Sequence, residues 1–222
     1  MEYYYGWSVC ISSQAGCRMG CRFCASGRHG LQRNLTPGEI ADQYLICERD
    51  VRLGYDSYGR ALGGAGRVKY VKHTDDEGKN RIGHIVMMGV GEPFDNYDNV
   101  LKFLTGVTAP EGRNLGRRQI TVSTCGLIEG MRRFMADLPQ VNLSLSLHAP
   151  NDEIRARIMP VGKRHGVREL VDFAREYAQT TGRRFTFEYA LFDGVNDSVE
   201  CADELADLLL EEAADRPRPL SA

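Results

Sequence analysis

The 222-residue chain has no uninterrupted apolar run of about 18 residues, the length at which a helix becomes a candidate to cross a membrane. Residues 1–5 also lack the basic stretch followed by an apolar segment that characterises a secretory signal. We therefore expect a cytoplasmic protein without a membrane anchor. A reducing compartment of this kind keeps cysteines available for metal binding.

The sequence also lacks an excess of positive charge. Its formal net charge of −2 argues against a dedicated nucleic-acid-binding module, which is normally basic. Basic residues do form local groups along the chain: Arg113, Arg117 and Arg118; Arg132 and Arg133; Lys163, Arg164 and His165; Arg183 and Arg184. Each group on its own is interpreted as solvated surface, so charge gives no indication of an RNA partner.

Three of the seven cysteines, Cys17, Cys21 and Cys24, form a CxxxCxxC motif. A disulfide framework is not favoured, because the number is odd and no secretory signal is present. Structural zinc usually takes four ligands in two pairs, and no second pair follows here. Thiolates are the usual ligands of iron–sulfur clusters, and three of them leave one iron of a [4Fe–4S] cluster open to a small molecule. The motif predicts such a cluster, with zinc or unligated thiols as alternatives.

Apolar segments of strand length alternate with segments of helical periodicity. Strands are predicted over residues 8–13, 85–88, 119–123, 141–147 and 185–189; helices over 36–51, 97–104, 127–138, from 152, 167–177 and 198–212. Thr36, Pro37 and Glu39 form a capping box that starts the first helix. This alternation indicates an α/β fold of parallel βαβ units, wound into a barrel or an open sheet.

One domain is predicted over residues 1–213. It contains an insertion at about residues 54–83, rich in Gly, Asp, Lys and Tyr, in which residues 68–71 are a candidate edge strand. Residues 214–222 are predicted to be a disordered polar tail. Cys47 lies at helical spacing with apolar residues, so we expect it to pack against the core.

Several motifs occur in a characteristic order: CISSQAGC at 10–17, CRFCASG at 21–27, RNLT at 33–36, GEP at 91–93, STCG at 123–126, SLHAPNDE at 146–153, FEY at 187–189 and GVNDS at 194–198. Together they resemble the RlmN/Cfr family of radical S-adenosylmethionine (SAM) enzymes, which methylate an adenine of 23S ribosomal RNA. The resemblance covers nearly the whole chain. It implies a partial (β/α)6 TIM-like barrel, expected here to lack its last strand.

These motifs follow predicted strands, and ligands of parallel α/β folds bind at the carboxyl ends of strands. The residues predicted to bind SAM are Phe23, Gly91, Glu92, Ser123, Ser146, Leu147 and His148. A carboxylate such as Glu92 suits the SAM ammonium group, and serine hydroxyls suit its carboxylate or ribose. The alternatives are a helix-end charge for Glu92 and a core histidine for His148.

In the RlmN/Cfr family a carrier cysteine near the C-terminus receives a methyl group, which a SAM-derived radical then activates for addition to adenine. The resemblance implies that Cys10 resolves the resulting crosslink by forming a disulfide with this carrier. The alternative for Cys10 is a buried strand thiol. No residue matches the carrier, and neither Cys125 nor Cys201 replaces it convincingly. We therefore expect a core fragment without the N-terminal domain and C-terminal segment of the family.

The favoured function is RlmN-like methylation of adenine carbon 2 in 23S rRNA, with tRNA as a second candidate substrate. A [4Fe–4S] cluster and SAM are the implied cofactors, and flavodoxin or ferredoxin is the implied electron donor. We expect a monomer. The alternatives are Cfr-like methylation at carbon 8, a radical-SAM activase of glycyl-radical enzymes, and a non-catalytic remnant that binds a cluster without cleaving SAM.

Overall fold

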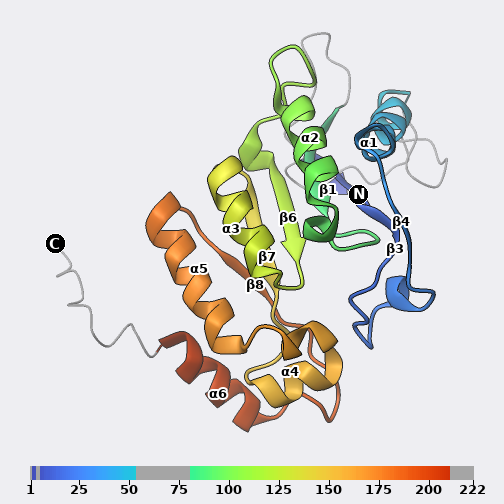
Figure 1. The fold of residues 1–222 in the computed structure, drawn as a ribbon. Helices are drawn as coiled ribbons and strands as arrows, with labels where there is room; N and C mark the ends of the chain where they lie inside the picture. Colours follow the sequence, from blue (N-terminus) through green and yellow to red (C-terminus); the bar gives the residue numbers. More distant parts are fainter. Residues whose placement is uncertain (1, 4–5, 54–80, 211–222) are drawn as a thin grey trace, which may run out of the picture.

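The computed structural model describes residues 2–3, 6–53 and 81–210. Its centre is a six-stranded sheet in the order β1-β2-β5-β6-β7-β8 (Figure 1). The strands are β1 (Glu2–Tyr3), β2 (Gly6–Cys10), β5 (Ile82–Met87), β6 (Ile120–Thr124), β7 (Asn142–Ser146) and β8 (Thr186–Glu188). All neighbours from β2 to β8 pair in parallel, and β1 pairs antiparallel to β2. The predicted α/β fold with a parallel sheet is confirmed.

The helices fill the connections between strands. They are α1 (Pro37–Arg52), α2 (Tyr97–Thr108), α3 (Ile128–Asp137), α4 (Asp152–Ile158), α5 (Val167–Thr181) and α6 (Val199–Leu210). Short 3-10 turns are η1 (Ala25–Gly27), η2 (Pro93–Asn96), η3 (Arg117–Gln119) and η4 (Pro160–Lys163). No helix in the described part of the chain is long and apolar enough to span a membrane.

The predicted start of the first helix is confirmed in detail. The hydroxyl of Thr36 accepts a hydrogen bond from the Glu39 amide, and the Glu39 carboxylate accepts one from the Thr36 amide at 2.9 Å. Arg33 pairs with the same carboxylate at 2.7 Å. Cys47 packs against the core as expected.

Some boundaries differ from the sequence-based expectation. Strand β2 ends at Cys10 rather than at residue 13, and β5 begins at Ile82, so the last two residues of the predicted insertion 54–83 belong to the sheet. The buried Glu48 explains the early start of β5, because its carboxylate accepts a 2.7 Å hydrogen bond from the Ile82 amide. The remainder of the insertion with its candidate strand 68–71, and the tail 214–222, lie outside the described residues.

A hairpin that the sequence does not predict follows β2. Strands β3 (Gln14–Gly16) and β4 (Leu31–Asn34) pair antiparallel and form a separate two-stranded sheet. Both strands are too short to show an alternating pattern in the sequence. The cysteine loop therefore connects the strands of this hairpin, and does not leave the first strand of the main sheet directly as expected.

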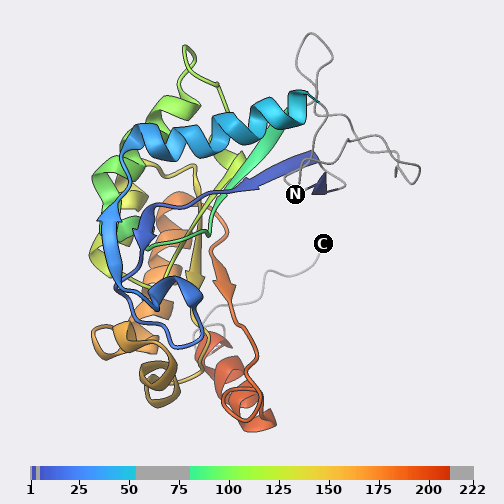
Figure 2. The same ribbon diagram turned by 90° about the vertical axis from the view of Figure 1, so that its right-hand side faces the viewer.

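The two faces of the main sheet differ in character. Residues such as Val9, Ile85 and Leu143 are buried against the helices, with α2, α3 and α5 on that side of the sheet (Figures 1 and 2). Many of the alternate residues, among them Thr121 and Ser144, are polar and point to the opposite face. Parallel sheets usually carry apolar residues on both faces. The polar face is therefore suited to hold a polar ligand.

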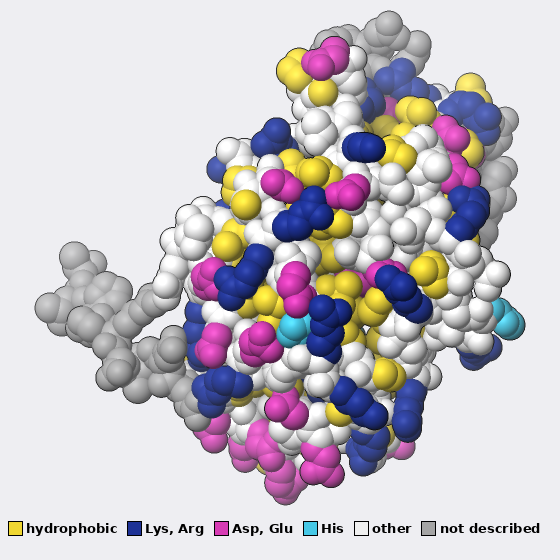
Figure 3. Space-filling view, viewed as in Figure 1, with side chains coloured by type: hydrophobic (Ala, Val, Ile, Leu, Met, Phe, Trp, Pro, Cys, Tyr) yellow, Lys and Arg dark blue, Asp and Glu magenta, His cyan; other side chains and the backbone are white. Residues whose placement is uncertain are grey.

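The basic groups seen in the sequence have two different placements. On the helical face, Arg132 pairs with Glu176 at 2.5 Å and Arg164 with Glu129 at 3.1 Å, and charges of both signs are interspersed (Figure 3). These pairs support the interpretation as solvated surface.

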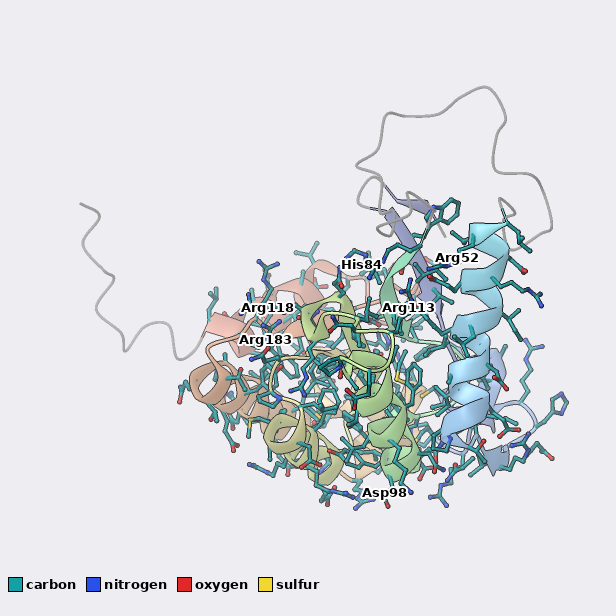
Figure 4. The ribbon with its side chains drawn as sticks, turned by 90° about the horizontal axis from the view of Figure 1, so that it is seen from above. Arg52, His84, Asp98, Arg113, Arg118 and Arg183 are labelled. Atoms are coloured by element: carbon teal, nitrogen blue, oxygen red, sulfur yellow. The ribbon has the colours of Figure 1, made fainter. Side chains whose placement is uncertain are left out.

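The second placement is the amino-end edge of the sheet. Arg118 lies in η3, the turn that leads into β6, and Arg183 lies in the segment that leads into β8 (Figure 4). Asn142 connects the two, because its amide group accepts a hydrogen bond from Arg183 at 2.5 Å and donates one to the Arg118 carbonyl at 2.8 Å. These arginines are thus remote from the carboxyl ends of the strands.

Candidate active site

A cavity of about 250 Å³ lies at the carboxyl ends of the parallel strands. Its lining includes all three motif cysteines, Cys17, Cys21 and Cys24. Of the residues predicted to bind SAM, it includes Phe23, Gly91, Glu92, Ser123, Ser146 and His148. Residues that are 131 positions apart in the sequence thus share one cavity, as the placement of the motifs after strands predicts.

The β3–β4 hairpin positions the cysteine loop. Gly16 adopts a positive φ of 78°, and a Cβ atom there would lie 2.0 Å from the Gly30 carbonyl oxygen, so only glycine allows the two strands to close. The Cys17 amide donates to the same oxygen at 3.2 Å. On the far side of the loop, the Arg22 amide donates to the Ile158 carbonyl of α4 at 2.9 Å. The loop is thus held at its base by the hairpin and near its middle by α4.

The three thiols are free and partly buried. Burial raises the pKa of Cys21 to about 11, with the neighbouring thiols adding to the effect, and burial likewise raises the pKa of Cys17. Thiols in this setting become thiolates when a metal centre binds and displaces their protons.

The arrangement fits an iron–sulfur cluster. Among residues 2–3, 6–53 and 81–210, no three His, Cys, Asp or Glu side chains converge closely enough to hold a single metal ion. The three thiols line one shared cavity, as ligands of a multi-atom cluster do. The soft sulfur donors also suit iron–sulfur chemistry.

Glu92 is a buried carboxylate at the edge of this cavity, 3% exposed. Its Oε1 accepts hydrogen bonds from the Thr124 hydroxyl at 2.7 Å and the Phe94 amide at 3.1 Å, and its Oε2 accepts one from the Cys125 amide at 2.8 Å. Burial raises the pKa of Glu92, against the opposing effect of these donors. Glu92 therefore caps the 3-10 turn η2, as the helix-end alternative proposes, and also lines the cavity.

Gln14 of β3 connects the hairpin to the backbone of Glu92, a role that was not anticipated from the sequence. Its side chain accepts from the Glu92 amide at 2.8 Å and donates to Asn34 at 2.8 Å and Asp95 at 2.9 Å. The positive φ of 107° at Gly91 brings the two segments together, since a Cβ atom there would lie 2.5 Å from the Gln14 side chain. A single glutamine in a three-residue strand carries no pattern that would reveal this role.

Glu188, part of the FEY motif, is a second acidic residue of the cavity, and it was not among the residues predicted to bind SAM. Its carboxylate accepts from the Ser144 hydroxyl at 3.0 Å and from the Ser146 hydroxyl at 3.4 Å. The detectable signal was a charged residue inside a strand, paired in register with Ser146. Of the two serines, the cavity lining includes Ser146 and not Ser144.

His148 forms an aromatic wall with Phe23 and Phe192. The ring centroids of Phe23 lie 5.1 Å from His148 and 4.9 Å from Phe192. The Nδ1 atom of His148 accepts a 3.0 Å hydrogen bond from the Ala190 amide, so the neutral ring carries its proton on Nε2. Burial lowers the pKa of His148. An exposed fraction of 42% leaves Phe23 free to cover a ligand.

Two predicted residues do not line the cavity. The side chain of Leu147 is fully buried in the core, and its amide donates a hydrogen bond to the Glu188 carbonyl at 3.0 Å. Cys10 ends β2 on the polar face of the sheet and is exposed, so the alternative of a buried strand thiol is wrong. Cys125 is the buried thiol of the site, and burial raises its pKa well above the usual range.

The family model of the Radical SAM superfamily matches residues 68–209. The chain belongs to this superfamily. Membership implies a [4Fe–4S] cluster and SAM as cofactors, and the described thiols and cavity fit both.

Individual relatives are similar over most of this radical SAM chain. It is 49% identical to a protein named "Probable dual-specificity RNA methyltransferase RlmN" from Pelotomaculum thermopropionicum. The match extends over 209 residues, which are 94% of this chain and 50% of the relative. A protein of the same name from Desulforamulus reducens is 46% identical, and the match covers 94% of this chain and 52% of that relative. The chain thus spans about half the length of the curated relatives it matches.

A solved structure supports the same fold. A radical SAM methyltransferase from Sphaerobacter thermophilus superposes with a TM-score of 0.77 at 43% identity, over 91% of this chain and 52% of that one. The predicted radical SAM type of α/β fold is therefore confirmed.

Proposed function

We propose that this chain is the cluster- and SAM-binding core of an RlmN-like RNA methyltransferase. The substrate would be adenine carbon 2 of 23S rRNA, with tRNA as a second substrate. The observation that carries the proposal is the single cavity in which the three motif thiols meet Glu92, Ser146 and His148. The relatives named RlmN support the choice of reaction.

Cys17, Cys21 and Cys24 would hold three irons of the cluster and leave the fourth for SAM. When bound, the cluster and SAM supply one-electron reductive radical chemistry. An electron donor of the flavodoxin or ferredoxin class would provide the electron. The protein itself holds the thiols in place through the β3–β4 hairpin.

The remaining residues of the cavity would orient SAM. Gly91, through its carbonyl, and Glu92 would face the ammonium group, because an anion and a dipole stabilise a cation in a buried site. Ser123 and Ser146 would donate to the carboxylate or the ribose hydroxyls. The Phe23 ring and the Nε2 proton of His148 would enclose the adenine, with the backbone of Leu147 completing the wall.

Cys10 would act after methyl transfer, as the thiol that forms a disulfide with the methyl-carrying cysteine. Its exposure on the polar face of the sheet makes it accessible to such a partner. Neither the buried Cys125 nor Cys201 on α6 is assigned the carrier role.

The test is anaerobic reconstitution of the 222-residue chain with iron and sulfide, followed by a SAM-cleavage assay with dithionite. We expect roughly four irons per chain and release of 5′-deoxyadenosine. Replacement of the three motif cysteines by alanine should abolish both, whereas Cys47→Ala, a thiol packed against the core, should change neither. Iron binding that survives the triple replacement would overturn the proposal.

The RNA specificity needs a separate measurement. Mass spectrometry of adenosine from treated 23S rRNA and tRNA distinguishes methylation at carbon 2 from carbon 8. We expect 2-methyladenosine when the segments that the longer relatives contain are supplied with this chain. Exclusive 8-methyladenosine would assign the chain to the Cfr-like reaction instead.

A further inference from the structure

Arg155 of α4 is a fully buried arginine, with an exposed fraction of 0%. Arginine is rarely buried to this extent unless its charge is paired with an acid. In the described part of the chain, however, Arg155 forms no ion pair with Asp or Glu. This buried charge therefore lacks the usual explanation.

The partners of the guanidinium group are all backbone carbonyls. Its Nη2 donates to the Cys125 carbonyl at 2.6 Å and the Ser146 carbonyl at 3.3 Å, and its Nε donates to the Leu147 carbonyl at 3.2 Å. These carbonyls end or follow β6 and β7, and two of the residues, Cys125 and Ser146, line the cavity. The Nη1 atom is buried and has no hydrogen-bond partner among the described residues.

Neutral carbonyls satisfy donors but do not neutralise a positive charge. A buried cation without a counter-charge is strongly disfavoured. Burial accordingly lowers the pKa of Arg155, and the charge of Asp152, which forms no ion pair with it, opposes this effect. The charge of Arg155 in turn partly opposes the rise that burial causes in the pKa of the Cys21 and Cys125 thiols. A buried positive charge without an acidic ion-pair partner in the described part of the chain thus acts on Cys21, which would become a thiolate when a cluster binds.

Helix α4 also contacts the cysteine loop directly. The Ile158 carbonyl at the end of α4 accepts from the Arg22 amide, and the side chain of Pro160 lies 3.5 Å from where a Cβ atom of Gly20 would be. Cys21, Cys125 and Met159 all line the cavity next to this contact. The helix therefore fixes Arg155 and the thiol loop relative to each other.

We propose that Arg155 is the buried counter-ion of the cluster, a positioning residue whose charge favours the reduced state. The inference rests on the proposed cluster site. Three thiolates and a [4Fe–4S]²⁺ core carry one net negative charge, and one electron from a low-potential reductant raises this to two without breaking a bond. A nearby cation stabilises the state with more negative charge and so raises the reduction potential.

The experiment is an anaerobic redox titration of the reconstituted 222-residue chain, followed by electron paramagnetic resonance of the reduced cluster. It compares wild type with Arg155→Met, Arg155→Gln and Arg155→Lys. Both neutral variants should lower the equilibrium constant for reduction about tenfold, a shift of about 59 mV for one electron. Arg155→Lys should recover more than half of that shift because it keeps the charge.

Arg157→Met is the matched control. Arg157 lies on the same helix but is exposed, so its removal changes the net charge equally without altering the buried field. We expect its potential to equal that of wild type. Since potentials are measured on loaded clusters only, a variant that binds less iron still gives a valid value.

Equal potentials in wild type and the neutral variants would overturn the inference and leave Arg155 a structural brace for β6 and β7. An equal shift in Arg155→Lys and Arg155→Met would overturn it too, because geometry rather than charge would then be responsible. A wild-type chain that binds no cluster would instead refute the proposed function, and this inference with it. If Arg155→Met holds no cluster, Arg155→Gln and Arg155→Lys provide the same comparison.

Discussion

The backbone amide of Cys125 donates to the Glu92 carboxylate at 2.8 Å and thereby connects the ends of two neighbouring strands. Glu92 follows β5, and Cys125 follows β6. The bond fixes the cavity edge that faces the cysteine loop. It also occupies one carboxylate oxygen of Glu92, the residue that we propose faces the SAM ammonium group.

Replacement of Glu92 by glutamine should therefore reduce both stability and SAM binding. The amide nitrogen of glutamine would face either the Cys125 donor or the Thr124 and Phe94 donors, so at least one buried donor loses its acceptor. We expect a loss of about 1–3 kcal/mol in the free energy of unfolding, measured by urea denaturation of the cluster-free chain. Thr124→Val, which removes a single donor, should cost less; an equal or greater loss would contradict this account.

The two serines that donate to Glu188 offer a matched pair. Ser146 lines the cavity and Ser144 does not, although both lie on the same face of β7. Ser146→Ala should weaken SAM binding about tenfold, the effect of one lost hydrogen bond to a charged group. Ser144→Ala should leave the dissociation constant nearly unchanged. Anaerobic equilibrium dialysis measures both, and equal effects would argue against a contact between Ser146 and SAM.

Gly16 and Gly30 test the hairpin that holds the cysteine loop. Both have a positive φ, but only at Gly16 would a Cβ atom meet the backbone, 2.0 Å from the Gly30 oxygen. Gly30→Ala should cost about 1–2 kcal/mol from backbone strain alone and keep most of the iron. Gly16→Ala should separate the strands because of this steric conflict, and the chain should then lose at least about half of its iron. The readout is iron per chain after reconstitution.

His148 should make stability depend on pH. Burial lowers its pKa below the usual 6.5 in the folded chain, near Glu188 and Arg155. As the pH falls below that value, the unfolded chain binds a proton that the folded chain excludes, so the free energy of unfolding decreases. The decrease levels off below the folded-state pKa.

His148→Asn provides the comparison for this effect. Asparagine tolerates the positive φ of 56° at this position and retains an acceptor for the Ala190 amide. Between pH 7.5 and 5.5 the variant should lose less stability than wild type. Parallel pH profiles from urea denaturation would show that His148 does not titrate as described.

The exposure of Cys10 predicts a difference in thiol reactivity. In the cluster-free chain under argon, iodoacetamide should modify Cys10 roughly ten times faster than the buried Cys125, because exposure governs access to the thiolate. Peptide mass spectrometry resolves the two sites. A Cys10 that reacts as slowly as Cys125 would remove the support for its proposed exchange with a partner thiol.

Local patterns in the sequence determined the secondary structure and the cysteine motif of this protein. The spacing of Cys17, Cys21 and Cys24, the capping box from Thr36 to Glu39 and the alternation of strands and helices depend on neighbours in the chain, and short-range rules describe them well. The expected meeting of motifs at one edge follows because parallel strands all end on the same side.

Only the tertiary structure decided which side chains share the cavity and what surrounds them. The acceptor role of Glu188, the bridge made by Gln14 and the burial of Arg155 all depend on contacts between residues far apart in the sequence, where no local period exists. Exposure likewise depends on packing, which leaves Cys10 exposed and buries Leu147 in the core. Burial and charge compensation are set by the whole fold, and therefore no segment of the sequence reveals them by itself.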